Sequence, residues 1–276
     1  MSAVVIGLAL FAAILHAAWN AFLRSGGDRL WTVTVMSFAS TVFALPFLFF
    51  YPLPASGAWL YILLSAVLQV GYSVFLVAAY RYGELGQAYP IVRGTVPLLV
   101  TLGGFVITGD KLTSYQIAGV VLVAVGIMSL ALGKGRASAS SILFALATGA
   151  IIAAYATVDS IGVRQTGQSG AYMAWVLVLY GAFLPAAFLV IRRRLIVDFR
   201  APETWKALGG GLVAMIAYGV VVAAFALGPA GPITALRETS VVFAVLIGWM
   251  FLGETLTARR ILACIIVAAG AILLGH

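Results

Sequence analysis

The chain has 276 residues, of which 63% are hydrophobic and only 9% are charged. A soluble domain carries about 25% charged residues, because its core needs a charged surface, so the composition excludes a soluble globule and indicates an integral membrane protein. The single cysteine, Cys264, excludes a disulfide framework and a cysteine-based metal cluster. The net charge of +8 indicates no partner until the basic residues are located.

Ten apolar stretches follow one another with short joints between them, and each matches the ~20 residues of a helix that crosses a bilayer. In chain order they cover residues 3–23, 30–50, 58–80, 87–108, 113–132, 139–161, 171–191, 205–227, 231–252 and 257–275. Their continuous apolar character differs from the alternation over about 10 residues of a transmembrane strand. The prediction is an all-α polytopic membrane protein with ten transmembrane helices.

Lysines and arginines are distributed unevenly between the two sets of joints. Twelve of the 16 lie in the joints opposite the termini, and two, Lys111 and Arg164, lie on the side of the termini. The twelve are Arg24, Arg29, Arg81, Lys134, Arg136, Arg192, Arg193, Arg194, Arg200, Lys206, Arg259 and Arg260. By the positive-inside rule, their side is cytoplasmic and both termini are extracytoplasmic. The charge therefore concerns insertion into the cell (inner) membrane, and we expect no nucleic-acid partner.

The second half of the chain repeats the first at an offset of 144 or 145 residues. Arg93 corresponds to Arg237, and GDKLTSYQI at 109–117 corresponds to GETLTARRI at 253–261. We expect two five-helix units, residues 1–136 and 137–276. Because five is odd, the second unit enters the membrane from the opposite side, so the repeats are inverted. Inverted repeats are typical of secondary transporters, whose substrate site lies near the midplane.

A five-plus-five duplication with a Gly-Asp/Glu-x-Leu-Thr joint before the last helix of each half resembles the EamA-type branch of the drug/metabolite transporter superfamily. The runs HAAWN at 16–20 and YPIVRG at 89–94 also resemble bacterial EamA sequences. The resemblance covers essentially the whole chain. It implies a secondary carrier of small metabolites, often an exporter, with a central cavity lined by helices 1, 3, 4, 6, 8 and 9. Members with basic residues at their termini have them inside, so the orientation predicted here departs from theirs.

Arg93 and Arg237 lie inside apolar spans at equivalent repeat positions. Each is about six residues, or ~9–10 Å, into its helix. An arginine at this depth faces a polar cavity or a partner, and a guanidinium binds carboxylate or phosphate bidentately. We expect an anion clamp supported by the prolines Pro97 and Pro232, which kink or start these helices. The alternative is a structural ion pair, with Arg237 bound to an acid.

Aromatic and polar residues inside other spans are further candidates for substrate binding. His16, Trp19 and Asn20 share one face of the first span by i, i+3, i+4 spacing, and they line a cavity or make an interhelical hydrogen bond. Deep aromatic residues contact a substrate ring or cation, or serve packing alone. They are Tyr72, Tyr155, Tyr218 and Trp249.

Three titratable residues in the spans are candidates for coupling transport to a proton or for binding a cation: Glu238, His16 and Asp159. The alternative for Glu238 is a partner for Arg93, Arg237 or His16. In a regular helix its side chain points about 100° away from that of Arg237. We interpret Asp110 and Glu254, in the repeat joints, as N-cap or first-turn residues of the fifth and tenth helices.

The sequence predicts a secondary transporter of a small anionic or zwitterionic organic metabolite, such as an amino acid, an aminophosphonate or an organic acid. It would work by alternating access, with proton coupling or exchange, as a monomer or weak dimer in the lipid bilayer. The alternative is an exporter of aromatic or cationic compounds, with Glu238 or Asp159 as counter-ion. No phosphate-binding lysine motif, catalytic pair or metal-ligand pattern indicates an enzyme, a cofactor or a metal.

Overall fold

The structure is a computed structural model that describes residues 1–25, 27–82, 85–131, 139–252 and 255–276. These residues form helices and contain no strand. The first part of the chain forms α1 (Ala3–Ser25), α2 (Arg29–Ala44), α3 (Phe47–Phe50), η1 (Ser56–Ala58), α4 (Trp59–Tyr82), α5 (Leu85–Gly103), η2 (Gly104–Thr108) and α6 (Ser114–Ser129). The second part forms α7 (Ala139–Thr166), α8 (Ser169–Arg192), α9 (Pro202–Leu227), α10 (Ala230–Glu238), α11 (Ser240–Leu252) and α12 (Ala258–Leu274).

Eight helical segments of the described chain are long and apolar enough to cross a membrane. They are Ala3–Asn20, Arg29–Phe50, Ser56–Phe75, Tyr89–Thr108, Ala139–Thr166, Ser169–Arg192, Pro202–Leu227 and Ala230–Met250. α6 has 16 residues and α12 has 17, fewer than the ~20 that span a bilayer unaided. The all-α membrane fold is thus confirmed, whereas helix length does not establish the expected number of ten spans.

Two helices begin at threonines that occupy equivalent positions in the two halves. Thr113 accepts a hydrogen bond from the backbone N–H of Gln116, and the Gln116 side chain accepts one from the Thr113 N–H, which completes a capping box. Thr257 accepts a hydrogen bond from the backbone N–H of Arg260 at the start of α12. The threonine of the shared Leu-Thr pair therefore sets where α6 and α12 begin.

The prediction that Asp110 caps α6 is wrong, because the chain enters the helix only after Thr113. Asp110 instead lies 3.5 Å from Arg164 at the end of α7. Arg164 also donates to the backbone oxygens of Phe225 and Gly228, which ties the end of α7 to the end of α9. Glu254, for which we expected the same role, lies outside the described residues.

The outer surface of the bundle is apolar, whereas charged side chains lie inside it. Phe49, Phe50 and Val106 have exposed fractions of 89%, 82% and 70%. Such a surface suits contact with lipid, and helices with internally satisfied backbones are the elements that tolerate it. Arg93 and Glu238 are buried. The interior thus contains groups that hydrocarbon would exclude, and they define where to look for function.

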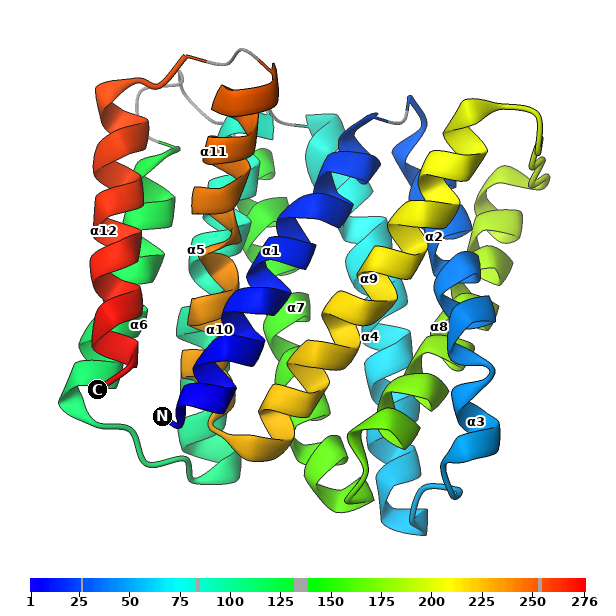
Figure 1. Cartoon of the computed structure of the whole chain (residues 1–276). Coiled ribbons are helices and arrows are strands. Elements are labelled where there is room, and N and C mark those ends of the chain that lie inside the picture. Colours follow the sequence, from blue (N-terminus) through cyan, green and yellow to red (C-terminus); the bar gives the residue numbers. More distant parts are fainter. Residues whose placement is uncertain (26, 83–84, 132–138, 253–254) are drawn as a thin grey trace.

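The helices pack so that elements from the two halves alternate across the centre. α1 packs against α9, α4 against α7, α5 against α10, and α2 against both α8 and α9. α6 and α12 pack against each other at one edge of the bundle, and the N- and C-terminal ends of the chain lie at the same end of it (Figure 1). This arrangement brings α1, α5 and α10 together in the interior.

Glycines allow the close contact between α6 and α12. A Cβ added at Gly119 would lie 2.8 Å from the backbone oxygen of Gly270, and one added at Gly270 would lie 2.8 Å from that of Gly119. Small residues let helix backbones approach one another in membranes, where dispersion contacts rather than the hydrophobic effect drive association. The contact joins the last helix of each half.

Candidate functional site

A cavity of about 110 Å³ lies inside the bundle, with walls from α1, α2, α4, α7, α8, α9 and α10. A water molecule needs roughly 10–15 Å³ of such space, so the cavity has room for a small organic molecule. Trp19 and Val33 line it within about two helical turns of the α1–α2 joint. The cavity therefore extends from the middle of the bundle towards the end opposite the chain termini.

Six of the residues predicted to bind substrate line this cavity: His16, Trp19, Tyr72, Tyr155, Tyr218 and Arg237. Tyr72 and Tyr155 face each other with ring centroids 6.1 Å apart. The wall therefore contains several aromatic rings, with a guanidinium and an imidazole as its strongest polar groups.

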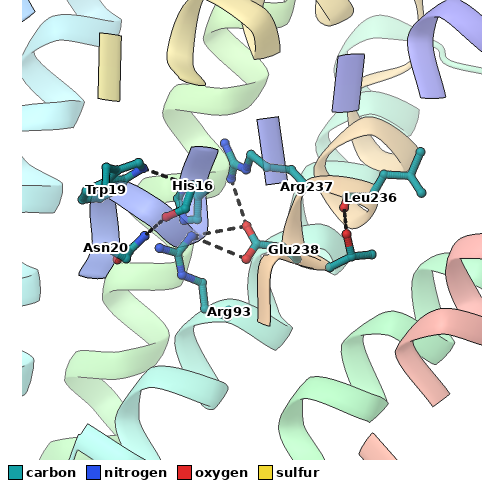
Figure 2. A network of polar contacts seen from close by, with 8 residues as sticks. His16, Trp19, Asn20, Arg93, Leu236, Arg237 and Glu238 are labelled. Atoms are coloured by element: carbon teal, nitrogen blue, oxygen red, sulfur yellow. Dashed lines mark hydrogen bonds and ion pairs between the residues drawn. The ribbon is translucent and has the colours of Figure 1, made fainter. Parts of the chain in front are cut away.

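Arg93, Glu238 and Arg237 form a buried ion cluster beside the cavity (Figure 2). Nη1 of Arg93 lies 3.4 Å from both carboxylate oxygens of Glu238, and Nη2 of Arg237 lies 3.0 Å from Oε1 of the same carboxylate. The guanidinium of Arg93 also lies 5.2 Å from the ring centroid of Tyr89. Because one carboxylate meets two guanidinium groups, the cluster keeps a net charge of about +1.

Arg237 and Glu238 bond to each other although they are neighbours in sequence. A regular helix separates their directions by about 100°, but α10 ends at Glu238 and the chain is interrupted at Thr239 before α11 begins. The hydroxyl of Thr239 donates to the backbone oxygen of Leu236 at this interruption (Figure 2). The expectation that Glu238 points away from Arg237 is therefore wrong, and both arginines are partners of this acid.

The face of α1 that carries His16, Trp19 and Asn20 forms its own hydrogen bonds (Figure 2). The indole Nε1 of Trp19 donates to Nδ1 of His16 at 3.1 Å, and the Asn20 side chain donates to the backbone oxygen of His16 at 2.8 Å. The rings of His16 and Trp19 meet edge to face at 5.1 Å. This local network fixes the orientation of the imidazole.

Asp159 is a second buried carboxylate, and it is bound in a different way. The hydroxyl of Tyr172 donates to its Oδ1 at 2.9 Å, and that of Tyr218 donates to its Oδ2 at 3.0 Å. These bonds connect α7 with α8 and α9. Nearer the end of the bundle that holds the termini, Trp59 and Trp175 meet with ring centroids 4.8 Å apart. Tyr218 belongs both to the Asp159 network and to the cavity wall, so this network adjoins the cavity.

Five predicted site residues lie outside the cavity wall. Three of them are buried behind the wall: Arg93, Glu238 and Asp159. The side chain of Asn20 donates a hydrogen bond to the backbone of α1. The fifth, Trp249, has an exposed fraction of 51% on α11, where it faces outward rather than into the cavity. The structure thus brings the charged candidates together and leaves Trp249 apart from them.

Small polar residues of α2 also line the cavity, and the sequence interpretation did not select them. Ser37 and Ser40 lie in its wall, and Ser40 donates to the backbone oxygen of Gly211 on α9. Their hydroxyls within an apolar span were the available signal. The resemblance implied a wall from helices 1, 3, 4, 6, 8 and 9; the second and seventh spans, α2 and α8, contribute as well, and the fourth, α5, does not.

These features define a class: an α-helical integral membrane protein that encloses a cavity lined by apolar, aromatic and a few polar side chains. The model of the EamA-like transporter family matches residues 3–132 and 139–275, which together make up nearly the whole chain. The chain therefore belongs to the EamA-like transporter family. The expected resemblance is confirmed, and the protein is a membrane transporter of this family rather than a member of an enzyme family.

A solved protein crystal structure supports the fold. It resembles this chain with a TM-score of 0.73, and the match covers 98% of this chain and 94% of the other at 15% sequence identity. At this identity the likeness concerns the fold alone. No curated protein matches the chain. What is carried must therefore be argued from the site itself.

Proposed function

We propose that the protein is a secondary transporter of a small anionic or zwitterionic organic metabolite and works by alternating access. An amino acid, an aminophosphonate or an organic acid fits this description. The observation that carries the proposal is the position of Arg237, which lines the cavity while it shares one carboxylate with a second arginine. An uncompensated positive charge at a cavity wall favours an anionic group.

The inverted repeat remains part of this proposal and is supported by the packing of the helices. If α1 corresponds to α7 and α4 to α9, the contact of α1 with α9 has its counterpart in that of α7 with α4. The contact of α5 with α7 likewise has its counterpart in those of α10 and α11 with α1. The family model also matches the chain in two segments, between which lies the proposed boundary at residues 136 and 137. Two equivalent halves give a physical route to two conformations of similar energy.

In the proposed orientation the basic joints are cytoplasmic and the termini extracytoplasmic in the inner membrane. The cavity extends towards the α1–α2 joint, which belongs to the basic side, and the Asp159 network joins α7, α8 and α9 nearer the other side. With this orientation, the conformation corresponds to a carrier that is accessible from the cytoplasm. Transport then requires opening the contacts between α7, α8 and α9.

Asp159 is the favoured candidate for proton coupling among Asp159, Glu238 and His16. Glu238 is bound by two guanidinium groups, so it already serves as the partner of both arginines. Within the described residues, Asp159 forms no ion pair, and the hydroxyls of Tyr172 and Tyr218 donate hydrogen bonds to it. A proton on Asp159 would weaken two bonds that tie α8 and α9 to α7. The export of aromatic or cationic compounds remains the alternative, with Asp159 rather than Glu238 as counter-ion.

Uptake by purified protein in proteoliposomes tests the proposal. A labelled organic acid or amino acid should exchange across the membrane, and Arg93→Ala and Arg237→Ala should each lower the rate. Asp159→Asn should abolish accumulation driven by a pH gradient while exchange of substrate for substrate continues. Normal transport in both arginine variants, or transport of cations only, would contradict the proposal.

A further inference from the structure

Two hydrogen-bond donors without partners lie in the wall of the cavity. Nε2 of His16 and Nε of Arg237 are buried, and neither has a hydrogen-bond partner among the described residues. The exposed fractions of the two residues are 8% and 6%, and both line the same cavity. A buried donor left without an acceptor is destabilising, so an acceptor in the cavity would stabilise this arrangement.

The Trp19 indole determines which nitrogen of His16 carries the proton. An indole N–H is a donor only, and it donates to Nδ1 of the imidazole at 3.1 Å. Nδ1 must therefore be the unprotonated nitrogen, and Nε2 carries the hydrogen. His16 is thus a residue of the cavity wall whose buried, unpartnered nitrogen carries an N–H rather than a lone pair, and the same holds for Nε of Arg237. Both residues belong to the wall of the same cavity.

The ion cluster sets how much charge the ligand should carry. Nη2 of Arg237 is bound to Glu238, and Glu238 also binds Arg93, so one positive charge remains for the three residues together. Two N–H donors and one net charge match the two oxygens and single charge of a carboxylate. A doubly charged phosphonate would leave one charge uncompensated in a buried site, which is costly.

We infer that His16 and Arg237 form the binding site for a single carboxylate group of the transported substrate, with Trp19 as a positioning residue. This inference rests on the proposed transport function and narrows the substrate to monocarboxylates. Tyr72, Tyr155 and Tyr218 form the wall around the rest of the molecule. Aromatic walls favour an apolar or aromatic body.

Calorimetric titration of the purified full chain with three probes of similar shape tests the charge requirement. Sodium phenylacetate should bind at least about tenfold more tightly than phenylacetamide, which has the same body without the charge. It should also bind more tightly than phenylphosphonate. Equal binding of acid and amide, or preference for the phosphonate, would overturn the inference.

Variants of His16 distinguish the role of its N–H donor from that of the packing of its imidazole ring. His16→Phe should weaken phenylacetate binding at least about tenfold, whereas His16→Gln, which keeps an N–H, should restore part of it. Phe11→Leu is the matched control, because Phe11 lies on the same helix and is 49% exposed on the outer surface. Equal binding by His16→Phe and the control would overturn the site.

The protonation of His16 has its own spectroscopic test. The chain contains two histidines, so His276→Gln leaves one ¹⁵N-labelled imidazole. Its spectrum should show a protonated Nε2 and an unprotonated Nδ1, and phenylacetate should shift the Nε2 resonance. Trp19→Phe should increase the other tautomer. A protonated Nδ1 in the otherwise unchanged protein would overturn the role of Trp19 and the site.

Transport measurements distinguish this inference from the proposed function. If phenylacetate binds as expected but proteoliposomes exchange no organic acid, the transport proposal fails and the carboxylate site stands. If organic acids exchange equally well in wild type, His16→Phe and Arg237→Lys, the carboxylate site fails while the transport proposal stands.

Discussion

The two buried carboxylates of this protein, Glu238 and Asp159, are stabilised by different kinds of partner. Glu238 lies between two guanidinium groups at 3.4 and 3.0 Å. Asp159 accepts hydrogen bonds from two tyrosine hydroxyls at 2.9 and 3.0 Å. Both have an exposed fraction of 0%. One carboxylate is compensated by charge and the other by neutral donors.

The difference between these partners indicates which cluster keeps its contacts and which cluster can rearrange. Removing one member of a buried ion pair leaves an uncompensated charge, so such clusters resist both mutation and protonation. A carboxylate held by phenols can take up a proton without leaving a charge behind it. We therefore expect the arginine cluster to provide a permanent field at the cavity, and the Asp159 cluster to respond to protons and to conformation.

The largest effect is expected for Glu238→Gln. This change leaves two guanidinium groups facing an amide in a buried site, and it should lower the free energy of unfolding by about 3–5 kcal/mol. Thermal unfolding of the purified protein in detergent measures it. Glu203→Gln at the exposed start of α9 is the control. Equal unfolding temperatures for the two variants would show that the ion cluster contributes little.

Substitutions of Arg93 and Arg237 should differ in their effect on transport, although they should lower the stability of the protein by similar amounts. Arg93→Gln and Arg237→Gln each leave Glu238 with one guanidinium and should lower the free energy of unfolding by about 1.5–3 kcal/mol. Of the two, only Arg237 lines the cavity, so Arg237→Gln should raise the KM of an anionic substrate, whereas Arg93→Gln should lower the rate of uptake without raising the KM. Initial rates of uptake over a range of substrate concentrations separate the two. A similar rise in KM for Arg93→Gln would assign both arginines to the substrate.

Tyr218→Phe should have a smaller effect on stability. It removes one neutral donor from Asp159 and should cost about 1–2 kcal/mol. Asp159 keeps the hydroxyl of Tyr172, so the fold should survive. Thermal unfolding at several pH values is the measurement, and the loss should be smaller wherever Asp159 is protonated. A loss as large as that for Glu238→Gln would remove the distinction between the clusters.

The smallest effect is expected outside both clusters, at Trp249. Its side chain is 51% exposed on the outer surface, so Trp249→Phe should change stability by less than about 0.5 kcal/mol. Substrate affinity should be unchanged. A clear increase in KM in the proteoliposome assay would return Trp249 to the binding site predicted from the sequence.

The sequence predicted the charged centre of the site, and it left open, as an alternative, the ion pairs of Glu238 with Arg93 and Arg237 that the structure contains. Arg93, Arg237 and Glu238 stood out because charges are rare in apolar spans. Their mutual pairing depends on the packing of α5 against α10 and on the interruption at Thr239, which no local pattern indicates. Tyr172, a donor to Asp159, was not selected because a tyrosine near a span end is also typical of the membrane interface.

Apolar periodicity separates the interior from the surface poorly in this chain. In a soluble helix the apolar face marks the core, but a helix in lipid is apolar on both faces. This explains why Tyr155 and Trp249 seemed equivalent in the sequence, although one lines the cavity and the other faces outward. The helices themselves were predictable, because their length and hydropathy depend on the bilayer rather than on their neighbours.

The interruption between α10 and α11 also bears on how the protein can move. At Thr239 the backbone bonds tighten: its N–H donates to Leu236, and the N–H of Val242 donates to Thr239. Such a local change of helical pitch often marks a hinge. Arg237 and Glu238 precede this hinge, so a tilt of α11 would not change their positions relative to Arg93 on α5. Movement of α11 about this hinge would therefore leave the ion pairs of Glu238 with Arg93 and Arg237 unbroken.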